Sequence, residues 1–305
     1  MTRALVLSGG GPVGIAWEAG LLAGLAEGGV DLAAADYILG TSAGSFVGSQ
    51  LAMGRKAADM AGAILAEAER VSAAVAAGSR PSAGGGGAGG GGGAPNLGLL
   101  FQKMAEARSG ERDPQEVRRE IGQFALETRT MDEESFIRSF GRHLSDLPAD
   151  AWPGRGYACT AVDAESGAFV VWNAESKVGL ARAVASSCSV PGIYPPITIN
   201  GRRYIDGGMR SGSNADLATG HELVVVVGLR TAGDAEASAR MRAPLEQEMQ
   251  VLRDAGARTE LILPDDASVA AFGLNLMDGR RRPGAAKAGI EQGRALAGSL
   301  KGVWG

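Results

Sequence analysis

The sequence predicts an α/β fold in which helices cover both faces of a mainly parallel central sheet. Short apolar strand patterns alternate with helical patterns in the first 55 residues, and the alternation returns near the end of the chain. The length of 305 residues suits one large α/β domain or two ordinary ones. Apolar residues make up 45% and charged residues 21%, so the composition excludes a wholly disordered chain.

The first two strand patterns each lead into a helical pattern. Residues 3–7 form a buried strand pattern that ends in glycines, and Pro12 suits the first turn of a helix that continues to about residue 27. A second strand is expected at 36–39, followed after a glycine-bounded turn by a helix at 46–53. Two strand–helix units in succession indicate parallel strands.

The middle of the chain predicts a helical insertion, which we define as residues 78–152. An alanine-rich helix over 56–77 precedes it, and residues 84–93 contain nine glycines in ten positions, which predicts a flexible loop. Three more helices are expected, at 97–108, 114–127 and 132–144.

The remaining patterns complete the α/β alternation. Strands are expected at 157–162, 168–172, 197–199, 203–205, 223–229 and 260–263. Helices are expected at 178–187, 235–255 and 284–300. The first two of these strands are predicted to form a hairpin over 165–167. We expect residues 221–305 to complete the same α/β domain as residues 4–220.

Charge and cysteine content narrow the functional classes. The net charge is −4 and the basic residues are dispersed except at Arg280–Arg282, so we expect no nucleic-acid partner. Two cysteines, Cys159 and Cys188, cannot form a disulfide framework. No signal-peptide pattern is visible and no apolar run approaches the ~20 residues of a membrane span, which predicts a cytoplasmic protein and leaves peripheral membrane contact open. No metal or cofactor is expected.

The first candidate motif follows the first strand, where Gly9, Gly10, Gly11 and Gly14 belong to the sequence Gly-Gly-Gly-Pro-Val-Gly. Consecutive glycines let backbone N–H groups turn toward a ligand, and a helix N-terminus adds partial positive charge, so the loop can hold a phosphate or a developing oxyanion. The loop also matches the dinucleotide pattern G-x-G-x-x-G, which usually needs an acidic residue at the end of the second strand. That strand ends at Gly40, so a nucleotide- or phosphate-binding module stays an alternative.

The second candidate motif, Gly40-Thr41-Ser42-Ala43-Gly44, has the form G-x-S-x-G. Between a strand and a helix, it predicts a sharp turn that exposes the serine oxygen at the helix N-terminus as a nucleophile. A glycine-rich turn with a helix-capping serine is the alternative interpretation.

A serine nucleophile needs a base, and the sequence offers few. His143 lies in the helical insertion, and His221 begins a predicted strand. Asp206 follows a short strand and precedes Gly207 and Gly208, which allow a sharp turn that aims its carboxylate outward. An ordinary Asp-Gly turn fits the same residues, so the motif alone does not assign the base.

Taken together, these residues resemble the patatin-like phospholipase family. An oxyanion loop of the GGG type, a G-x-S-x-G elbow and a downstream D-G-G occur in the family's order, at Gly9–Gly14, Gly40–Gly44 and Asp206–Gly208. The segment 185–196 resembles the family's approach to its aspartate, and Asn214 fits a recurrent asparagine.

The resemblance implies a three-layer α/β/α fold and a lipid-degrading acyl hydrolase over residues 4–220. It implies that Ser42 is the nucleophile and Asp206 the general base of a Ser–Asp dyad that uses no histidine. It places the oxyanion hole at the N–H groups of Gly9–Gly11. The implied substrates are acyl esters of lipids, especially phospholipids and lysophospholipids, and no cofactor is implied.

Two positions depart from the family pattern. Val13 stands where Arg or Lys often precedes the last glycine of the loop. A cation near the oxyanion hole or the head group is therefore missing, which weakens the case for anionic head groups more than the case for hydrolysis. Ser8 replaces the usual acid at the start of the loop.

Several alternatives are left open. An α/β-hydrolase with a Ser42–Asp206–His221 triad has the right chain order, although only two strands precede the elbow. The insertion is expected to be a surface elaboration, or else a lid over the acyl site with residues 84–93 as its hinge. The apolar residues that would then face the acyl chain are Leu99, Leu100, Phe101 and Met104. Outside the motifs, the glycine surplus is interpreted mainly as compositional bias.

Overall fold

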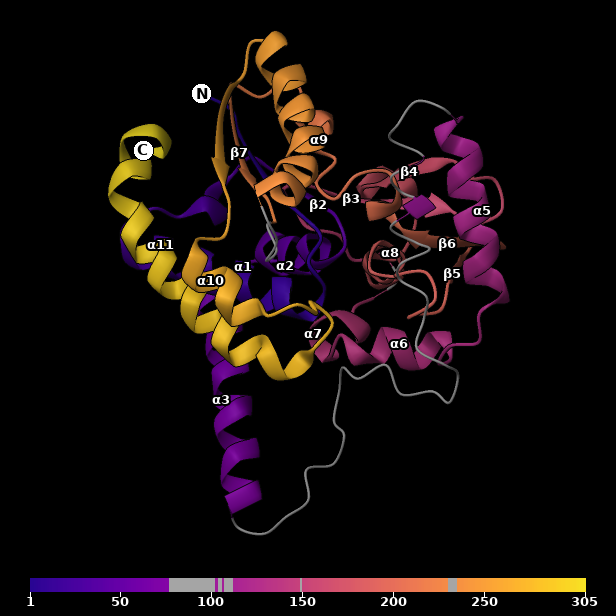
Figure 1. The fold of residues 1–305 in the computed structure, drawn as a ribbon, viewed down its shortest axis with the longest axis horizontal. Helices are drawn as coiled ribbons and strands as arrows, with labels where there is room; N and C mark the ends of the chain where they lie inside the picture. Colours follow the sequence, from indigo (N-terminus) through magenta and orange to yellow (C-terminus); the bar gives the residue numbers. More distant parts are fainter. Residues whose placement is uncertain (77–101, 104–105, 107–111, 149, 230–234) are drawn as a thin grey trace.

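The computed structural model describes residues 1–76, 102–103, 106, 112–148, 150–229 and 235–305 (Figure 1). The predicted glycine-rich loop at 84–93 and most of the predicted helix at 97–108 lie outside these residues, as do the four apolar residues assigned to a lid. The lid hypothesis therefore stays a prediction.

A mixed, mostly parallel sheet forms the centre of the fold, with eight strands in the described part of the chain (Figure 1). The strands are β1 (Arg3–Leu7), β2 (Tyr37–Gly40), β3 (Gly156–Asp163), β4 (Phe169–Trp172), β5 (Ile197–Ile199), β6 (Arg202–Asp206), β7 (Leu223–Val227) and β8 (Arg258–Ile262). Their order is β5-β6-β3-β2-β1-β7-β8, and β4 also pairs with β3. Neighbours from β3 to β8 along this order are parallel, whereas β4, β5 and β6 pair in antiparallel fashion. The predicted fold class is confirmed.

Helices cover both faces of the sheet because its central strands are apolar on both sides. In β1, Leu5 and Leu7 pack into a core cluster with residues of α1, α2, α3, α8 and α11, whereas Ala4 and Val6 pack with residues of α9 on the other face. The helices are α1 (Gly11–Glu27), α2 (Ala43–Ala52), α3 (Ala57–Ala76), α5 (Pro114–Glu127), α6 (Glu133–Ser139), α7 (Arg142–Ser145), α8 (Leu180–Ser187), α9 (Ala235–Asp254), α10 (Asp266–Phe272) and α11 (Arg282–Trp304). No helix among the described residues is both long enough and apolar enough to cross a membrane.

Several elements differ from the predicted ones. The helix predicted at 132–144 is divided into α6 and α7, because Gly141 between them takes φ 81°. The helix predicted at 178–187 begins at Leu180, and the strand predicted at 223–229 ends at Val227. α10 was not predicted, since its seven residues are too few for a clear helical period.

The central helix α1 packs directly on α11 through glycines. A Cβ at Gly20 would lie 2.2 Å from the carbonyl oxygen of Ala286, and a Cβ at Gly289 would lie 2.4 Å from that of Trp17. Gly24 approaches α11 to the same extent, since its Cβ would lie 2.1 Å from a carbonyl oxygen. Compositional bias is therefore the wrong interpretation for these glycines, which let two helix backbones touch.

We predict that Gly289→Ala lowers the free energy of unfolding by about 1–3 kcal/mol, because the added methyl group forces α1 and α11 apart. Gly298→Ala is the matched control in the same helix, since a Cβ there meets nothing within 4 Å. That change should be neutral or stabilise the protein by up to about 1 kcal/mol. Urea denaturation of both variants tests the prediction, and equal unfolding free energies would contradict it.

Candidate active site

Ser42 lies at a sharp turn between β2 and α2. Its backbone takes φ 52° and ψ −118°, a conformation that costs a residue other than glycine about 1–3 kcal/mol. The flanking glycines make the turn possible. A Cβ at Gly40 would lie 2.5 Å from the Gly44 carbonyl oxygen, and one at Gly44 would lie 2.1 Å from the Leu7 carbonyl oxygen. The G-x-S-x-G pattern thus occupies the strand–turn–helix that the sequence predicts.

Three buried side chains hold the backbone of Ser42 in this conformation. Its N–H donates a hydrogen bond to Ser187 Oγ at 3.1 Å. Its carbonyl oxygen accepts hydrogen bonds from Ser45 Oγ at 2.7 Å and Cys188 Sγ at 3.1 Å. No sequence motif marks any of these three residues as a partner of Ser42, although Ser187 and Cys188 lie in the segment that resembles the family's approach to its aspartate.

Asp206, at the end of β6, lies beside Ser42. Its carboxylate accepts a hydrogen bond from the Ser42 side chain and another from the Gly208 N–H at 2.7 Å. Its own N–H donates to the Ser189 carbonyl oxygen at 3.0 Å, which fixes its backbone. Only 2% of the residue is exposed, and this burial raises the pKa of the carboxyl to about 7, although both hydrogen bonds lower it. The structure therefore brings together the two residues predicted to form the dyad.

The glycine loop lies against Ser42 and offers two N–H groups. A Cβ at Gly9 would lie 3.3 Å from Ser42 Cβ, so the loop passes next to the serine. The Gly9 N–H, however, donates to the Gly212 carbonyl oxygen at 2.8 Å and is not available to a ligand. No described residue accepts a hydrogen bond from the N–H of Gly10 or Gly11. Of the three glycines predicted to form the oxyanion hole, Gly10 and Gly11 therefore keep N–H groups without an acceptor in the described chain, whereas Gly9 does not.

Two helices begin side by side at this loop. α1 starts at Gly11 and α2 at Ala43, and a Cβ at Gly14 would contact the Ala43 Cβ at 3.5 Å. Within the described chain, the Ala43 N–H also has no acceptor. Because each helix N-terminus carries partial positive charge, these free N–H groups suit a developing oxyanion. Ala43 was not predicted as a donor, although an elbow places the residue after its serine at a helix N-terminus.

The position that departs from the family pattern is part of the core. Val13 is fully buried in the apolar cluster between the sheet and the helices α1, α2, α3, α8 and α11. Its N–H donates to the Leu276 carbonyl oxygen at 3.2 Å. Two residues earlier, a Cβ at Gly11 would lie 2.8 Å from Met277 Sδ. The segment with Leu276 and Met277 therefore packs on the glycine loop. A cation at position 13 would be buried without a partner in this packing, which is costly.

Asn214 connects the serine turn to the aspartate turn. Its Nδ2 lies 3.0 Å from Thr41 Oγ1 and 3.4 Å from the Gly207 carbonyl oxygen. Thr41 directly precedes Ser42, and Gly207 directly follows Asp206. Asn214 is fully buried, so its hydrogen bonds are shielded from water and fix the two turns relative to each other.

Neither histidine reaches this site. His221 stacks on Tyr37 with ring centroids 5.1 Å apart, and its Nδ1 lies 3.0 Å from the Ala218 carbonyl oxygen. Tyr37 is the first residue of β2, whereas Ser42 follows the last residue of that strand. His221 therefore lies at the end of the parallel strands opposite to Ser42. His143 is exposed on α7. The alternative triad is therefore not assembled.

A nucleotide-binding module of the G-x-G-x-x-G type needs an acidic residue at the end of its second strand, and β2 has none there. β2 ends at Gly40, and the nearby acids precede the strand. Asp31 caps a short helix at its Ala33 N–H, and Asp36 accepts a hydrogen bond from the Arg3 N–H at 2.7 Å. In the part of the chain that the structure describes, no three His, Cys, Asp or Glu side chains are grouped as metal ligands.

The chain was compared with family models, curated proteins and solved structures, and the similar solved structures include VipD and ExoU. A family model described as patatin-like phospholipase matches residues 5–219. No curated protein matches the sequence. The crystal structure of VipD from Legionella pneumophila is 15% identical with a TM-score of 0.47, over 98% of this chain and 67% of that one. The type III effector protein ExoU is 15% identical with a TM-score of 0.39, over 98% of this chain and 53% of that one. Both of those chains are longer than this one.

We predict that Asn214→Ala lowers the free energy of unfolding by about 1–3 kcal/mol, because it leaves buried polar groups of both turns without their partner. Asn200→Ala is the matched control. Both asparagines have φ 51°, but Asn200 is exposed in a turn, so the control isolates the backbone cost of the substitution. Thermal or urea unfolding measures the difference, and an equal loss in both variants would refute the bridging role of Asn214.

Proposed function

Because the chain belongs to the patatin-like phospholipase family of lipid acyl hydrolases, we propose that it cleaves lipid carboxylic esters with Ser42 as nucleophile and Asp206 as general base. The observation that carries the proposal is the hydrogen bond between the Ser42 side chain and the buried Asp206 carboxylate. Free N–H groups lie next to this pair. A nucleophile, a base and oxyanion donors within reach of one another are the components of acyl transfer.

In the first half-reaction, Ser42 Oγ attacks the carbonyl carbon of the ester and Asp206 takes the hydroxyl proton. The carbonyl oxygen becomes an oxyanion, which accepts hydrogen bonds from the N–H groups of Gly10, Gly11 and Ala43. A single such donor contributes about a hundredfold or more to the rate of an acyl-transfer enzyme. When the intermediate collapses, the ester C–O bond breaks, Asp206 gives its proton to the leaving alcohol, and the acyl group stays on Ser42.

In the second half-reaction, water replaces the alcohol. Asp206 takes a proton from the water molecule as its oxygen attacks the acyl carbon, and the same N–H groups stabilise the second oxyanion. Collapse releases the fatty acid, and the proton on Asp206 returns to Ser42 Oγ. The sequence of steps uses no cofactor and no histidine.

Burial makes a carboxylate an adequate base in this site. An exposed aspartate has a pKa near 3.9 and holds a proton too weakly to remove one from a hydroxyl group efficiently. The surroundings of Asp206 raise the pKa to about 7, which brings it close to neutral working pH. The Ser42 side chain lies beside this carboxylate and lowers its pKa, so the proton that Asp206 would take is close to its acceptor oxygen.

We assign phospholipids, lysophospholipids or related acyl esters as substrates, and the breakdown of lipids as the role. The family membership supports the lipid part of this assignment. The position of His221, stacked on Tyr37 at the start of β2, supports a Ser–Asp dyad over the Ser42–Asp206–His221 triad.

We predict that Ser42→Ala abolishes hydrolysis of a p-nitrophenyl ester and labelling by a fluorophosphonate probe, and leaves the fold intact. His221→Asn is the control that separates a dyad from a triad, since it should keep near-normal turnover. Hydrolysis rates, probe labelling and thermal unfolding of both variants test this. Full activity in Ser42→Ala would rule out the nucleophile, and collapse of activity in His221→Asn would favour the triad.

We predict that kcat/KM of the wild type rises with pH through about 7, because Asp206 acts as a base only when it is ionised. Below that pH the rate should fall about tenfold per pH unit as the carboxyl becomes protonated, and above it the rate should level off. Asp206→Asn should be inactive at every pH. A rate profile that is flat from pH 5.5 to 8 would contradict this role.

A further inference from the structure

The backbone of Ser8 joins the glycine loop to the serine turn. Its carbonyl oxygen accepts a hydrogen bond from the Gly44 N–H at 3.0 Å, and its own N–H donates to the Val227 carbonyl oxygen at 3.2 Å. The free N–H groups of the glycine loop follow within three residues. Their position relative to the nucleophile therefore depends on how firmly Ser8 is held.

A buried glutamate lies behind this junction. Glu18 is in α1, one helical turn after Gly14, whose Cβ would contact the Ala43 Cβ at the start of α2. The Ser8 N–H also donates to the carboxyl group of Glu18, and only 3% of this glutamate is exposed. In the described chain, the buried side-chain atoms without a hydrogen-bond partner are Glu18 Oε2 and Ser8 Oγ. Both unsatisfied atoms therefore belong to this one junction.

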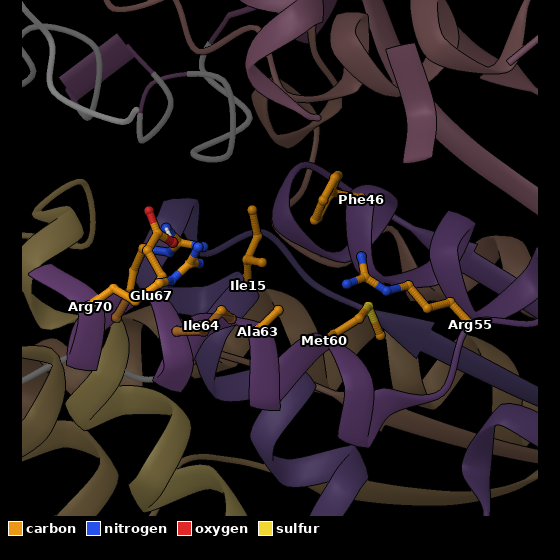
Figure 2. A pocket seen from close by; sticks show the side chains of 9 residues that line it. Ile15, Phe46, Arg55, Met60, Ala63, Ile64, Glu67 and Arg70 are labelled. Carbon is orange, nitrogen blue, oxygen red and sulfur yellow. Dashed lines mark hydrogen bonds and ion pairs between the residues drawn. The ribbon is translucent and has the colours of Figure 1, made fainter. Parts of the chain in front are cut away.

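No cation of the described chain compensates Glu18. α1 packs on α2, α3, α11 and the turn at 279–281, and α2 contains no charged residue. The charged residues of the other three elements are exposed, apart from half-buried Arg282, which forms an ion pair with Glu67. Arg55, between α2 and α3, lines a pocket whose lining does not include Glu18 (Figure 2).

Glu18 is therefore an uncharged acid at neutral pH, because a buried carboxylate without a cation is costly. Burial raises the pKa of Glu18 well above its usual value, and the hydrogen bond from Ser8 only partly opposes this. The neighbouring titratable group is the Cys188 thiol, which donates to the Ser42 carbonyl oxygen at 3.1 Å. Burial raises the pKa of this thiol, and negative charge on Asp206 or Glu18 raises it further, so both carboxyl groups lie near it.

We propose that Glu18 is a positioning residue, whose uncharged carboxyl group holds the Ser8 backbone, and with it the glycine loop, against the serine turn. The inference rests on the proposed function, because the loop acts there through its oxyanion donors. The absence of charge is part of the role. Glu18 follows Gly11 by seven residues and so lies roughly 10 Å along α1 from that donor. At this distance a carboxylate would repel a developing oxyanion enough to slow the reaction about tenfold.

Glu18 also accounts for Ser8 in place of the acid that usually begins the loop. A carboxyl group at position 8 would share one buried place with that of Glu18, without a cation between them, and two such groups cannot both ionise there. The chain therefore carries a single carboxyl group at this point, on α1 rather than in the loop.

The first experiment compares Glu18→Gln with Glu18→Leu on a p-nitrophenyl ester. Glutamine keeps the length, the neutrality and an oxygen that accepts from Ser8, whereas leucine is buried equally well but lacks the acceptor. Glu18→Gln should keep kcat within about threefold of the wild type. Glu18→Leu should lose about tenfold or more in kcat with little change in KM, because oxyanion donors act on the transition state. Thermal unfolding shows whether each variant is folded.

The matched control is Gln50→Leu, which removes a buried polar side chain from the neighbouring helix α2. Gln50 is also 3% exposed, but its Oε1 accepts a hydrogen bond from Arg55 at 3.2 Å rather than from the loop. This variant should lose stability and keep its kcat. An equal loss of kcat in Gln50→Leu and Glu18→Leu would reduce Glu18 to a general stabilising role and overturn the proposal.

The second experiment detects the proton on Glu18 without any substrate. A neutral Glu18 binds one proton more in the folded chain than in the unfolded chain, where its pKa is near 4.3. Raising the pH from about 5.5 to 8 should therefore lower the stability of the wild type relative to Glu18→Gln, by about tenfold in the folded-to-unfolded ratio per pH unit. Asp206 titrates in both proteins, so its contribution cancels. Difference infrared spectra should show the C=O stretch of a protonated carboxyl group that Glu18→Gln lacks.

The outcomes separate this inference from the proposed function. A loss of kcat in Glu18→Gln as large as that in Glu18→Leu would overturn the neutral positioning role. A stability difference that does not change with pH would show that Glu18 is ionised in the folded chain and would overturn it as well. Absence of hydrolysis by the wild type would instead refute the proposed function, while the pH dependence of stability and the infrared band would still decide the charge of Glu18.

Discussion

The positive-φ backbone of Ser42 is the constraint on which the rest of the site depends. The turn presses Gly44 against the carbonyl oxygen of Leu7 in β1, so only a residue without a Cβ fits there. The strain needs compensation, which comes from the hydrogen bond that the Ser42 N–H donates to Ser187 Oγ and from those that Ser45 and Cys188 donate to the Ser42 carbonyl oxygen. Since Ser187 ends α8, the packing of α8 against β3 and α2 is a condition for the turn at Ser42 rather than a separate feature of the fold.

The register of the sheet explains how Asp206 meets this turn. Gly40 at the end of β2 is opposite Cys159 in β3, and Asp206 in β6 is opposite Ala161, two residues further along β3. Ser42 is also two residues beyond Gly40, so serine and aspartate reach the same level on either side of β3. Burial at this level makes the ionised carboxylate costly to the folded state, and the same cost makes it a stronger base. The site thus gains reactivity by giving up some stability at neutral pH.

The sequence could predict those parts of the site that depend on local geometry. A serine between small residues after a strand, or an aspartate before two glycines, predicts a sharp turn within a few residues. Ser42 and Asp206 could therefore be predicted from their motifs. Ser187 and Asn214 act across distances of 145 and 173 residues in the chain, and nothing local marks a serine or an asparagine as a partner of such a turn. The engagement of the Gly9 N–H was likewise hidden, because its acceptor lies in a loop after β6. The alternation of strands and helices gave the fold, whereas α10 and the break at Gly141 depend on short segments without a clear period.

The same distinction applies to charge. A motif position records which residue a family often uses, but it does not record which other elements lie near the same point in space. At position 13 the side chain is enclosed by the core, where an isolated cation would lose its hydration without gaining a partner. The missing cation of the loop is therefore weak evidence about head-group preference, since the charge that a ligand meets depends on every element that lies near it.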